Sequence, residues 1–482
     1  MSDPFAGLEP ALLWGYFRTL STIPRGSKQE AEAARWVADQ GRALGCEVEQ
    51  DAVGNVRIRK AASPGREGRP SVALQAHVDM VCEKNEDTVH DFTTDPIRVR
   101  RDGDWVRATG TTLGADNGIG VATALAVLAT PGLVHPPLEI LVTVDEETGL
   151  TGANNVGQGW LRSAVLLNLD SEEDGELTIG CAGGVDTVAT RPVTWESAPA
   201  GFLARRLKVS GLKGGHSGVD IAMNRGNAIR VLAEALCVFV PALGLTVGPV
   251  AGGNKRNAIA REASAVVYVA PAKLAALEAA VAQRSGDVQR ALGAFDPGAQ
   301  VSLGPVDESR ALASDDAASL VALLLAGPHG VEAMSPAIPG LVQTSVNLGI
   351  VHSGSDSVEV CFLTRSSIDA SKHALAARIA TIGAACGFTT AEDNDYPGWK
   401  PEPGAGIVRL VQEVHQDVVG KPMRVSAIHA GLECGIIGEK CPGMEMASIG
   451  PTMLDVHTPD ERVSITSVAQ FWTLLVAILA RL

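Results

Sequence analysis

The chain of 482 residues carries 40 Lys and Arg against 55 Asp and Glu, a net charge of −15, and 46% of its residues are hydrophobic. A hydrophobic fraction of this size excludes intrinsic disorder and, at ~150 residues per domain, indicates roughly two to four folded domains. The acidic balance argues against a general nucleic-acid-binding protein, because neutralising phosphates requires a basic surface.

The placement of cysteines and apolar residues predicts a cytoplasmic protein. The eight cysteines form no Cys-x-x-Cys pair, which is typical of reduced thiols. The first residues carry acids and prolines where an export signal would have basic residues and an apolar run, so we expect no such signal. The apolar stretch 471–480 is about half the ~20 residues that a membrane-spanning helix requires, so we expect no membrane contact.

The first part of the chain alternates helix-like and strand-like patterns. The predicted elements are helices between residues 8 and 44 and at 119–129, and strands at 56–58, 71–81, 138–144 and 165–169. The longer strands are nearly unbroken apolar runs, which is typical of parallel strands buried on both faces. We therefore predict an α/β domain with a mixed, mostly parallel sheet and helices on both faces.

A different pattern begins near residue 187, where alternating strands mix with helices in an α+β arrangement. The predicted strands lie at 205–209, 263–269, 344–350 and 358–363, and the predicted helices at 227–238, 272–284, 317–325 and 372–385. A Pro-rich stretch at 397–403 marks the end of this region, and the α/β pattern then resumes with a helix at 406–419. We predict one domain made of residues 1–186 and 399–482, interrupted by an inserted domain at 187–398.

Polar residues with metal-ligand chemistry stand at the ends of the predicted apolar strands. His77 and Asp79 are two apart, so on a strand their side chains leave the same face, and the carboxylate can hold the imidazole in place. Asp116 precedes the helix at 119–129, where it could equally be a helix cap. Each of these features alone has an ordinary structural explanation.

Two acidic clusters strengthen the interpretation. Asp145, Glu146 and Glu147 follow one buried strand directly, and Asp170 ends another. Adjacent carboxylates repel one another, so a bound cation explains them better than a solvated loop does. Ligands in open α/β sheets gather at the carboxyl ends of the strands, so these side chains are expected to converge there on two divalent ions that share a carboxylate. Glu146 and Glu147 could then divide the roles of base and ligand.

In this order, the motifs resemble those of the co-catalytic zinc peptidases of the aminoacylase and carboxypeptidase-G type. The motifs are His77-Val78-Asp79, Gly114 to Gly118, Asp145 to Gly149, Asn168-Leu169-Asp170, Gly214 to Gly218 and a late His457. Within that family, the stretches 76–81, 252–259 and 428–435 look most like the aminoacyl-histidine dipeptidases, also called cytosol nonspecific dipeptidases. The resemblance covers nearly the whole chain.

The resemblance implies a role for each strand-end residue. His77 and Asp170 would bind one zinc, Glu147 and His457 the other, with Asp116 bridging them, Asp79 orienting His77 and Glu146 acting as general base. His457 stands about 290 residues beyond Asp170, which fits a domain insertion. Without the other clusters, His457 would be taken for a surface histidine.

The resemblance also implies that the inserted domain is a lid that supplies substrate contacts and dimer contacts. His216, in a glycine-rich motif that could be a simple turn, would stabilise the oxyanion, from this chain or from a partner subunit. Asn257 and Arg365 in this domain, and His429 in the resumed first domain, would bind substrate. Arg365 is suited to pairing with a peptide carboxylate, although it could also be an ordinary exposed charge. Glu433 has no role that the sequence assigns.

The sequence therefore predicts a cytoplasmic, homodimeric dipeptidase that hydrolyses unblocked dipeptides, including Xaa-His, by attack of metal-bound hydroxide with Glu146 as general base. We expect zinc as the metal, with cobalt or manganese as alternatives. Two other functions stay open: a related amidohydrolase acting on N-acyl amino acids or tripeptides, and a non-catalytic binding relative.

Overall fold

The computed structural model describes residues 3–482, and their contacts divide them into two compact units. Unit 1 comprises the residues up to Gly180 together with Pro401–Ala427 and Leu432–Leu482, and unit 2 comprises Cys181–Lys400 and Ile428–Gly431. Unit 2 is thus inserted into unit 1 along the chain. The first division falls between residues 180 and 181 rather than between 186 and 187, because strand β9 (Gly183–Pro192) pairs with strands of unit 2 along its whole length.

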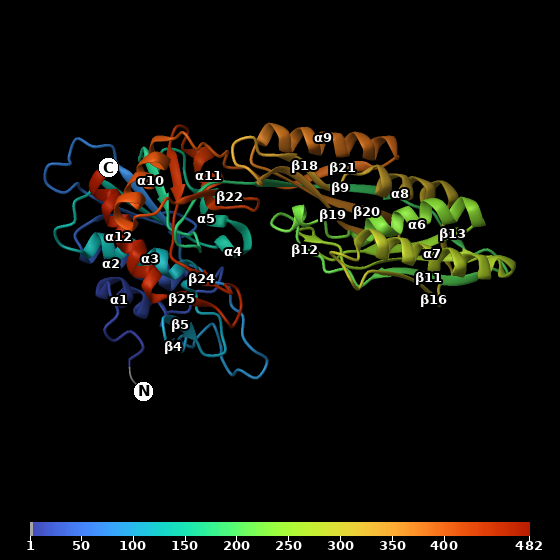
Figure 1. The fold of residues 1–482 in the computed structure, drawn as a ribbon, viewed down its shortest axis with the longest axis horizontal. Coiled ribbons are helices and arrows are strands. Elements are labelled where there is room, and N and C mark those ends of the chain that lie inside the picture. The colour runs from blue at the N-terminus through green and yellow to red at the C-terminus, as the bar shows by residue number, and fades with distance from the viewer. Residues whose placement is uncertain (1–2) are drawn as a thin grey trace. The chain divides into compact units, whose positions relative to one another are not determined.

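Unit 1 is built on an eight-stranded mixed sheet (Figure 1). In spatial order the strands are β1 (Glu47–Gln50), β2 (Val56–Lys60), β6 (Leu138–Thr143), β3 (Val72–His77), β7 (Val165–Asn168), β23 (Glu445–Ser448), β8 (Glu176–Cys181) and β22 (Arg424–Ile428). The four central strands, β6, β3, β7 and β23, run parallel, and antiparallel pairs flank them. Every residue of β3 and β6 is buried, as the unbroken apolar runs predict.

Helices and a second, smaller sheet complete unit 1. The helices are α1 (Ala11–Leu20), α2 (Ala31–Ala43), α3 (Ala115–Ala129), α4 (Glu146–Gly149), α5 (Thr151–Asn155), α10 (Gly406–Val419), α11 (Glu433–Lys440) and α12 (Ile465–Arg481). The second sheet has the strand order β24 (Met453–Leu454), β25 (Arg462–Ser464), β5 (Trp105–Ala108) and β4 (Val99–Asp102). The predicted α/β class is confirmed for this unit.

Unit 2 contains a nine-stranded antiparallel sheet. Its strands are β16 (Gln300–Pro305), β11 (Leu203–Ser210), β15 (Ala263–Val269), β13 (Thr246–Gly252), β19 (Val342–Ser353), β20 (Ser357–Ser366), β9 and β21 (Thr389–Tyr396) in this order, with β18 (Gly330–Met334) paired to β19. Two short ladders lie beside it, one of β10 (Trp195–Ser197) with β17 (Arg310–Leu312) and one of β12 (Gly215–His216) with β14 (Ala258–Ile259). Strands and helices are mixed along this segment, which is the predicted α+β pattern.

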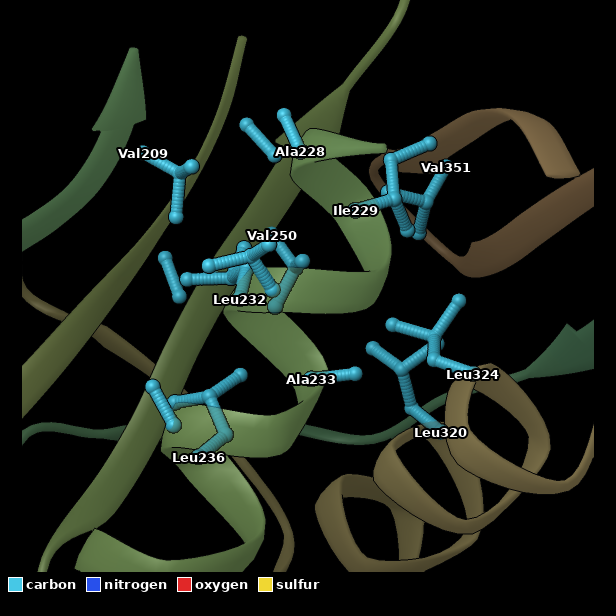
Figure 2. Close-up of a cluster of buried hydrophobic side chains, with 14 of the residues drawn as sticks. Val209, Ala228, Ile229, Leu232, Ala233, Leu236, Val250, Leu320, Leu324 and Val351 are labelled. Carbon is cyan, nitrogen blue, oxygen red and sulfur yellow. The ribbon is translucent and has the colours of Figure 1, made fainter. Parts of the chain in front are cut away.

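Four helices bury one apolar core against the large sheet of unit 2. They are α6 (Ala228–Leu243), α7 (Leu274–Leu292), α8 (Ser314–Ala326) and α9 (Asp369–Ala385). Figure 2 shows α6 presenting Leu232 and Leu236 on its buried side, with Leu320 and Leu324 of α8 beside it. Helix α6 begins where the Asn227 side chain accepts hydrogen bonds from two backbone N–H groups of the first turn.

Among the residues that the structure describes, no helix combines the length and the apolar character needed to cross a membrane.

Candidate active site

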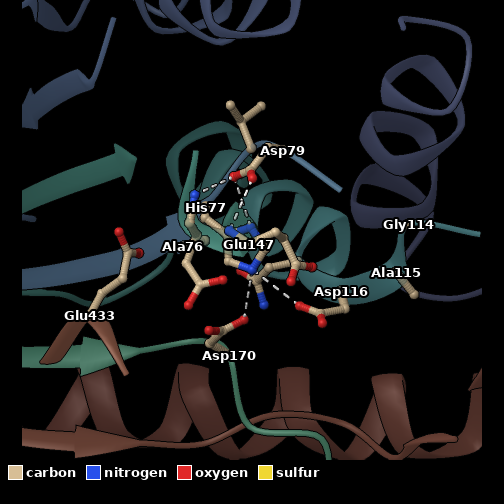
Figure 3. A network of polar contacts seen from close by, with 12 residues as sticks. Ala76, His77, Asp79, Gly114, Ala115, Asp116, Glu147, Asp170 and Glu433 are labelled. Atoms are coloured by element: carbon tan, nitrogen blue, oxygen red, sulfur yellow. Dashed lines mark hydrogen bonds and ion pairs between the residues drawn. The ribbon is translucent and has the colours of Figure 1, made fainter. Parts of the chain in front are cut away.

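The first group of predicted site residues gathers in unit 1 around His77, the last residue of β3 (Figure 3). His77 is almost fully buried. Its Nδ1 lies 3.3 Å from Asp79 Oδ1, and its Nε2 lies 3.1 Å from Asp116 Oδ1 and 3.4 Å from Asp170 Oδ1. The ends of two parallel strands and the start of one helix thus bring three carboxylates onto one imidazole.

Asp79 connects this imidazole to the turn that carries the acidic pair. Its carboxylate accepts hydrogen bonds from the backbone N–H groups of Glu146 (3.0 Å) and Glu147 (3.2 Å) and from Ser27 Oγ (2.8 Å). Burial alone would raise the pKa of Asp79, but the hydrogen bond and charge of His77 and the Glu146 N–H group lower it to about 2. Asp79 therefore stays ionised and fixes both His77 and the turn at residues 146 and 147.

Asp116 lies between the two histidines of the group. Its Oδ1 faces His77, and its Oδ2 is 3.0 Å from His457 Nε2, which is also 3.0 Å from Glu147 Oε2. Hydrogen bonds from both imidazoles outweigh the burial of Asp116 and lower its pKa, and the bonds to Asp116 and Glu147 raise the pKa of His457 to about 11. The chain-distant His457 thus joins the group from the loop between β24 and β25.

Two residues that the sequence did not single out hold the segment before Asp116. The buried Glu461 accepts hydrogen bonds from four consecutive backbone N–H groups, those of residues 113–116, at 2.6–3.3 Å. The buried Arg25 donates to the carbonyl oxygens of Val78, Asp79 and Gly114. Arg25 thus joins the two segments that carry Asp79 and Asp116, and Glu461 joins the second of them to the loop that carries His457.

The remaining acids of the group are crowded. Burial, followed by the neighbouring carboxylates of Asp116 and Glu147, raises the pKa of Asp170 to about 6 despite the nearby His77. Burial and the charges of Asp170 and nearby glutamates also raise the pKa of Glu146 well above its ordinary value. Close packing of like charges in a buried site favours either protonation of the acids or a bound cation.

The donor set fits divalent metal ions. Three sets of side chains place one ligating atom each within 4.8 Å of one another: His77, Asp116 and Asp170; His77, Glu146 and Glu147; and Asp116, Glu147 and His457. Glu147 Oε1 is buried and accepts no hydrogen bond in the described structure. Two imidazoles with several carboxylates and no thiolate suit borderline to hard divalent ions.

Glu433, which the sequence left without a role, lies beside this group at the start of α11 (Figure 3, left). Its carboxylate accepts hydrogen bonds from Thr143 Oγ1 (2.6 Å) and Gln75 Nε2 (2.5 Å), one from each of the adjacent strands β6 and β3. Burial, with smaller effects from neighbouring acids, raises the pKa of Glu433 to about 7. Glu433 thus links two of the strands whose ends carry the candidate ligands.

The second group of predicted residues lies in unit 2 around Arg365 of β20. Arg365 is only 5% exposed, and it contacts three neutral groups: Ser217 Oγ at 3.2 Å, Tyr396 Oη at 2.9 Å and His216 Nε2 at 3.5 Å. Arg365 is therefore not the exposed surface charge that the sequence left as an alternative. His216 and Arg365 meet within one chain.

The surroundings of His216 determine its charge and which ring nitrogen carries its proton. Its Nδ1 accepts the backbone N–H groups of Gly218 (3.2 Å) and Val219 (3.1 Å). Burial, followed by the charge of Arg365, lowers the pKa of His216 to about 4, so the ring is neutral near pH 7. A neutral ring whose Nδ1 accepts carries its proton on Nε2. His216 Nε2–H and the Arg365 guanidinium are both donors, and an acceptor can bind both.

The other two predicted substrate residues have different surroundings. His429 is buried with its Nε2 2.7 Å from Ser345 Oγ, and burial, with Arg365 and His216 adding to it, lowers its pKa to about 3. Asn257 is exposed, and its carbonyl oxygen accepts the Ser217 N–H group at 2.9 Å. The structure thus links Asn257 to the loop of His216 through its backbone.

A sequence model of peptidase family M20/M25/M40 matches residues 73–481. The chain belongs to this family. This peptidase is therefore a peptide hydrolase, and the family resemblance read from its motifs is confirmed.

Two relatives resemble this M20-family peptidase over almost its whole length. The cytosol non-specific dipeptidase of Escherichia coli strain K12 is 42% identical over 473 residues, which cover 98% of each chain. The crystal structure of an aminoacylhistidine dipeptidase from Vibrio alginolyticus superposes with a TM-score of 0.92 at 40% identity, covering 100% of this chain and 98% of that one. An aminopeptidase from Bacillus cereus shares the fold, with a TM-score of 0.58 at 17% identity over 98% of both chains.

Replacing His429 by Gln should flatten the pH dependence of the free energy of unfolding of this peptidase. Folded His429, with its pKa lowered to about 3, stays neutral, while the unfolded chain binds a proton below the ordinary histidine value of about 6.5. The stability due to neutral His429 is therefore fully present above about pH 7 and decreases as the pH falls, by about 2 kcal/mol at pH 5.

Urea unfolding of wild type and His429→Gln at pH 7.5 and pH 5 measures this difference. His352→Gln, at an exposed position of the same unit, is the matched control and should keep the wild-type pH dependence. An equal loss of stability between the two pH values in wild type and His429→Gln would contradict the assignment.

Proposed function

We propose that this M20-family peptidase is a cytoplasmic metallo-dipeptidase that hydrolyses unblocked dipeptides, including those of the Xaa-His type. The observation that carries the proposal is the convergence of His77, Asp116, Glu147, Asp170 and His457 at the carboxyl ends of parallel strands. The names of the two relatives that are 42% and 40% identical over nearly the whole chain support the substrate class and the location.

The proposed cofactors are two divalent ions. Zinc is the metal that we propose, and cobalt and manganese are the alternatives. His77 and Asp170 would hold one ion and Glu147 and His457 the other, with Asp116 between them, because its two oxygens face the two imidazoles. When bound, such ions polarise a peptide carbonyl and lower the pKa of water, so that it attacks near neutral pH.

Glu146 is the proposed general base. It begins helix α4, three residues beyond the end of β6, and Asp79 accepts a hydrogen bond from its backbone N–H group at 3.0 Å. The raised pKa of its buried carboxyl suits a group that takes a proton from the attacking water and then gives it to the leaving amine. Glu147, whose Oε2 contacts His457, is suited to the ligand role instead.

Unit 2 offers donors for the rest of the substrate. Arg365, a buried guanidinium among neutral groups, is the proposed partner of the substrate carboxylate. His216 would donate its Nε2–H to the carbonyl oxygen, where negative charge develops during hydrolysis. His429 and Asn257 complete the proposed substrate-binding set.

A homodimer formed through unit 2 is a further proposal. It is supported only by the family resemblance read from the motifs. Light scattering after size exclusion should give about twice the chain mass of 50.0 kDa, and a single-chain mass would exclude the dimer.

A panel of peptides tests the proposed function. Unblocked dipeptides, among them Ala-His, should be hydrolysed with a kcat/KM at least about 100-fold higher than their N-acetylated counterparts or tripeptides, because a site built around a free amine and carboxylate rejects blocked analogues. Each peptide is assayed after addition of zinc, cobalt or manganese. Preference for N-acetylated amino acids or tripeptides would favour the related amidohydrolase instead.

Glu146→Gln should lower kcat by about 100- to 10,000-fold while the protein keeps its metal, because the amide cannot accept the proton. Metal content per chain and turnover of the best dipeptide are measured on the same preparation. Glu86→Gln, at an exposed position of unit 1, is the matched control and should behave as wild type. A Glu146→Gln variant that holds metal and remains active would rule out this mechanism.

A further inference from the structure

Arg365 is a buried cation, and none of its hydrogen-bond partners in the described structure carries a negative charge. A buried guanidinium is costly unless a negative charge compensates it, yet the contacts of Arg365 are with a serine hydroxyl, a tyrosine hydroxyl and a neutral imidazole. These partners orient the side chain without neutralising it, and the carboxylate of Asp186, on which the charge of Arg365 also acts, pairs with Arg256 at 2.9 Å instead. The negative charge that this site lacks would come from the substrate carboxylate of the proposed function.

The hydroxyl of Tyr396 stands directly beside this charge. Its oxygen accepts a hydrogen bond from Arg365 Nη1 at 2.9 Å. A phenol has one O–H donor in addition to its acceptor lone pairs, so the proton of Tyr396 remains available for another acceptor. An anion that pairs with Arg365 can therefore receive a second hydrogen bond from Tyr396.

Tyr396 is fixed in place by the chain around it. A Cβ atom added at Gly184 would lie 2.7 Å from the tyrosine hydroxyl and ring edge, and one added at Gly431 would lie 3.0 Å from the ring. Both glycines therefore leave room for the aromatic side chain. The fully buried Lys372 donates to the Tyr396 carbonyl oxygen at 2.6 Å, and Asp395 holds that ammonium group at 2.6 Å. A donor held this rigidly loses little entropy when it binds.

We propose that Tyr396 is a specificity residue for the free carboxylate of the dipeptide, to which its hydroxyl donates a hydrogen bond alongside Arg365. This inference rests on the proposed function, in which Arg365 binds that carboxylate. Tyr396 then favours peptides with a free C-terminus over C-terminal amides, because an amide has no charged oxygen to receive both donors.

The experiment compares wild type and Tyr396→Phe with one unblocked dipeptide and its C-terminal amide. For the dipeptide, kcat/KM should fall about 10- to 100-fold in Tyr396→Phe, mainly through KM, because a hydrogen bond to a charged group is lost. The inhibition constant of the amide against the same dipeptide should change by a smaller factor, about two- to tenfold, because a hydrogen bond to a neutral amide oxygen is weaker than one to a carboxylate. The Tyr396→Phe variant should therefore lose most of the preference for a free C-terminal carboxylate over a C-terminal amide.

Tyr268→Phe is the matched control. Tyr268 is a buried tyrosine of the same unit whose hydroxyl donates to the Arg310 carbonyl oxygen at 2.8 Å, and its removal should leave both constants unchanged. Circular dichroism and thermal unfolding check that both variants are folded.

Two results would overturn the inference while leaving the proposed function intact: unchanged dipeptide kinetics in a folded Tyr396→Phe, or equal losses for dipeptide and amide. If wild type hydrolysed no unblocked dipeptide, the proposed function itself would fail, and the inference would fail with it.

Discussion

Repulsion among buried carboxylates is the constraint on which the candidate active site depends. Asp79, Asp116, Glu146, Glu147 and Asp170 share a small volume with two imidazoles. Like charges at these distances in a buried setting move apart unless cations and fixed hydrogen-bond donors oppose them. Asp79 has such donors in two backbone N–H groups and a serine hydroxyl. A further buried acid next to this group, Glu461, accepts hydrogen bonds from four backbone N–H groups.

The arrangement in unit 2 is the electrostatic opposite. There, a buried cation contacts neutral groups, and both nearby histidines have lowered pKa values because they are buried near Arg365. Arg365 thus places one positive charge among neutral donors, whereas the strand ends of unit 1 hold several negative charges. A dipeptide carries a carboxylate, which is the kind of group that the donors of unit 2 lack.

Much of the candidate site in unit 1 could be predicted from the sequence, because its ionisable residues stand at the ends of strands. Unbroken apolar runs located β3, β6 and β7, and the polar residues that follow each run could only lie at one edge of a parallel sheet. Glu461 and Arg25 were not predicted, because their function lies in bonds to the backbone of segments far away in sequence, and no pattern of residue types marks such a bond. The same limit applied in unit 2, where the contact of Tyr396 with Arg365 depends on how β21 pairs with β9 beside β20. Strand order in a large antiparallel sheet is set by long-range packing, which periodicity does not encode.

Three of the contacts of Asp79, those with His77 and with the N–H groups of Glu146 and Glu147, have a consequence for how this site can evolve. One carboxylate sets the imidazole of His77 and also, through the N–H groups of Glu146 and Glu147, the direction in which those two side chains leave the turn. Substitutions at these four positions cannot have independent effects, because each changes the geometry in which the others act. The effects of mutations at this site are therefore epistatic. Whether a substitution at one of the four positions is tolerated depends on the residues at the other three.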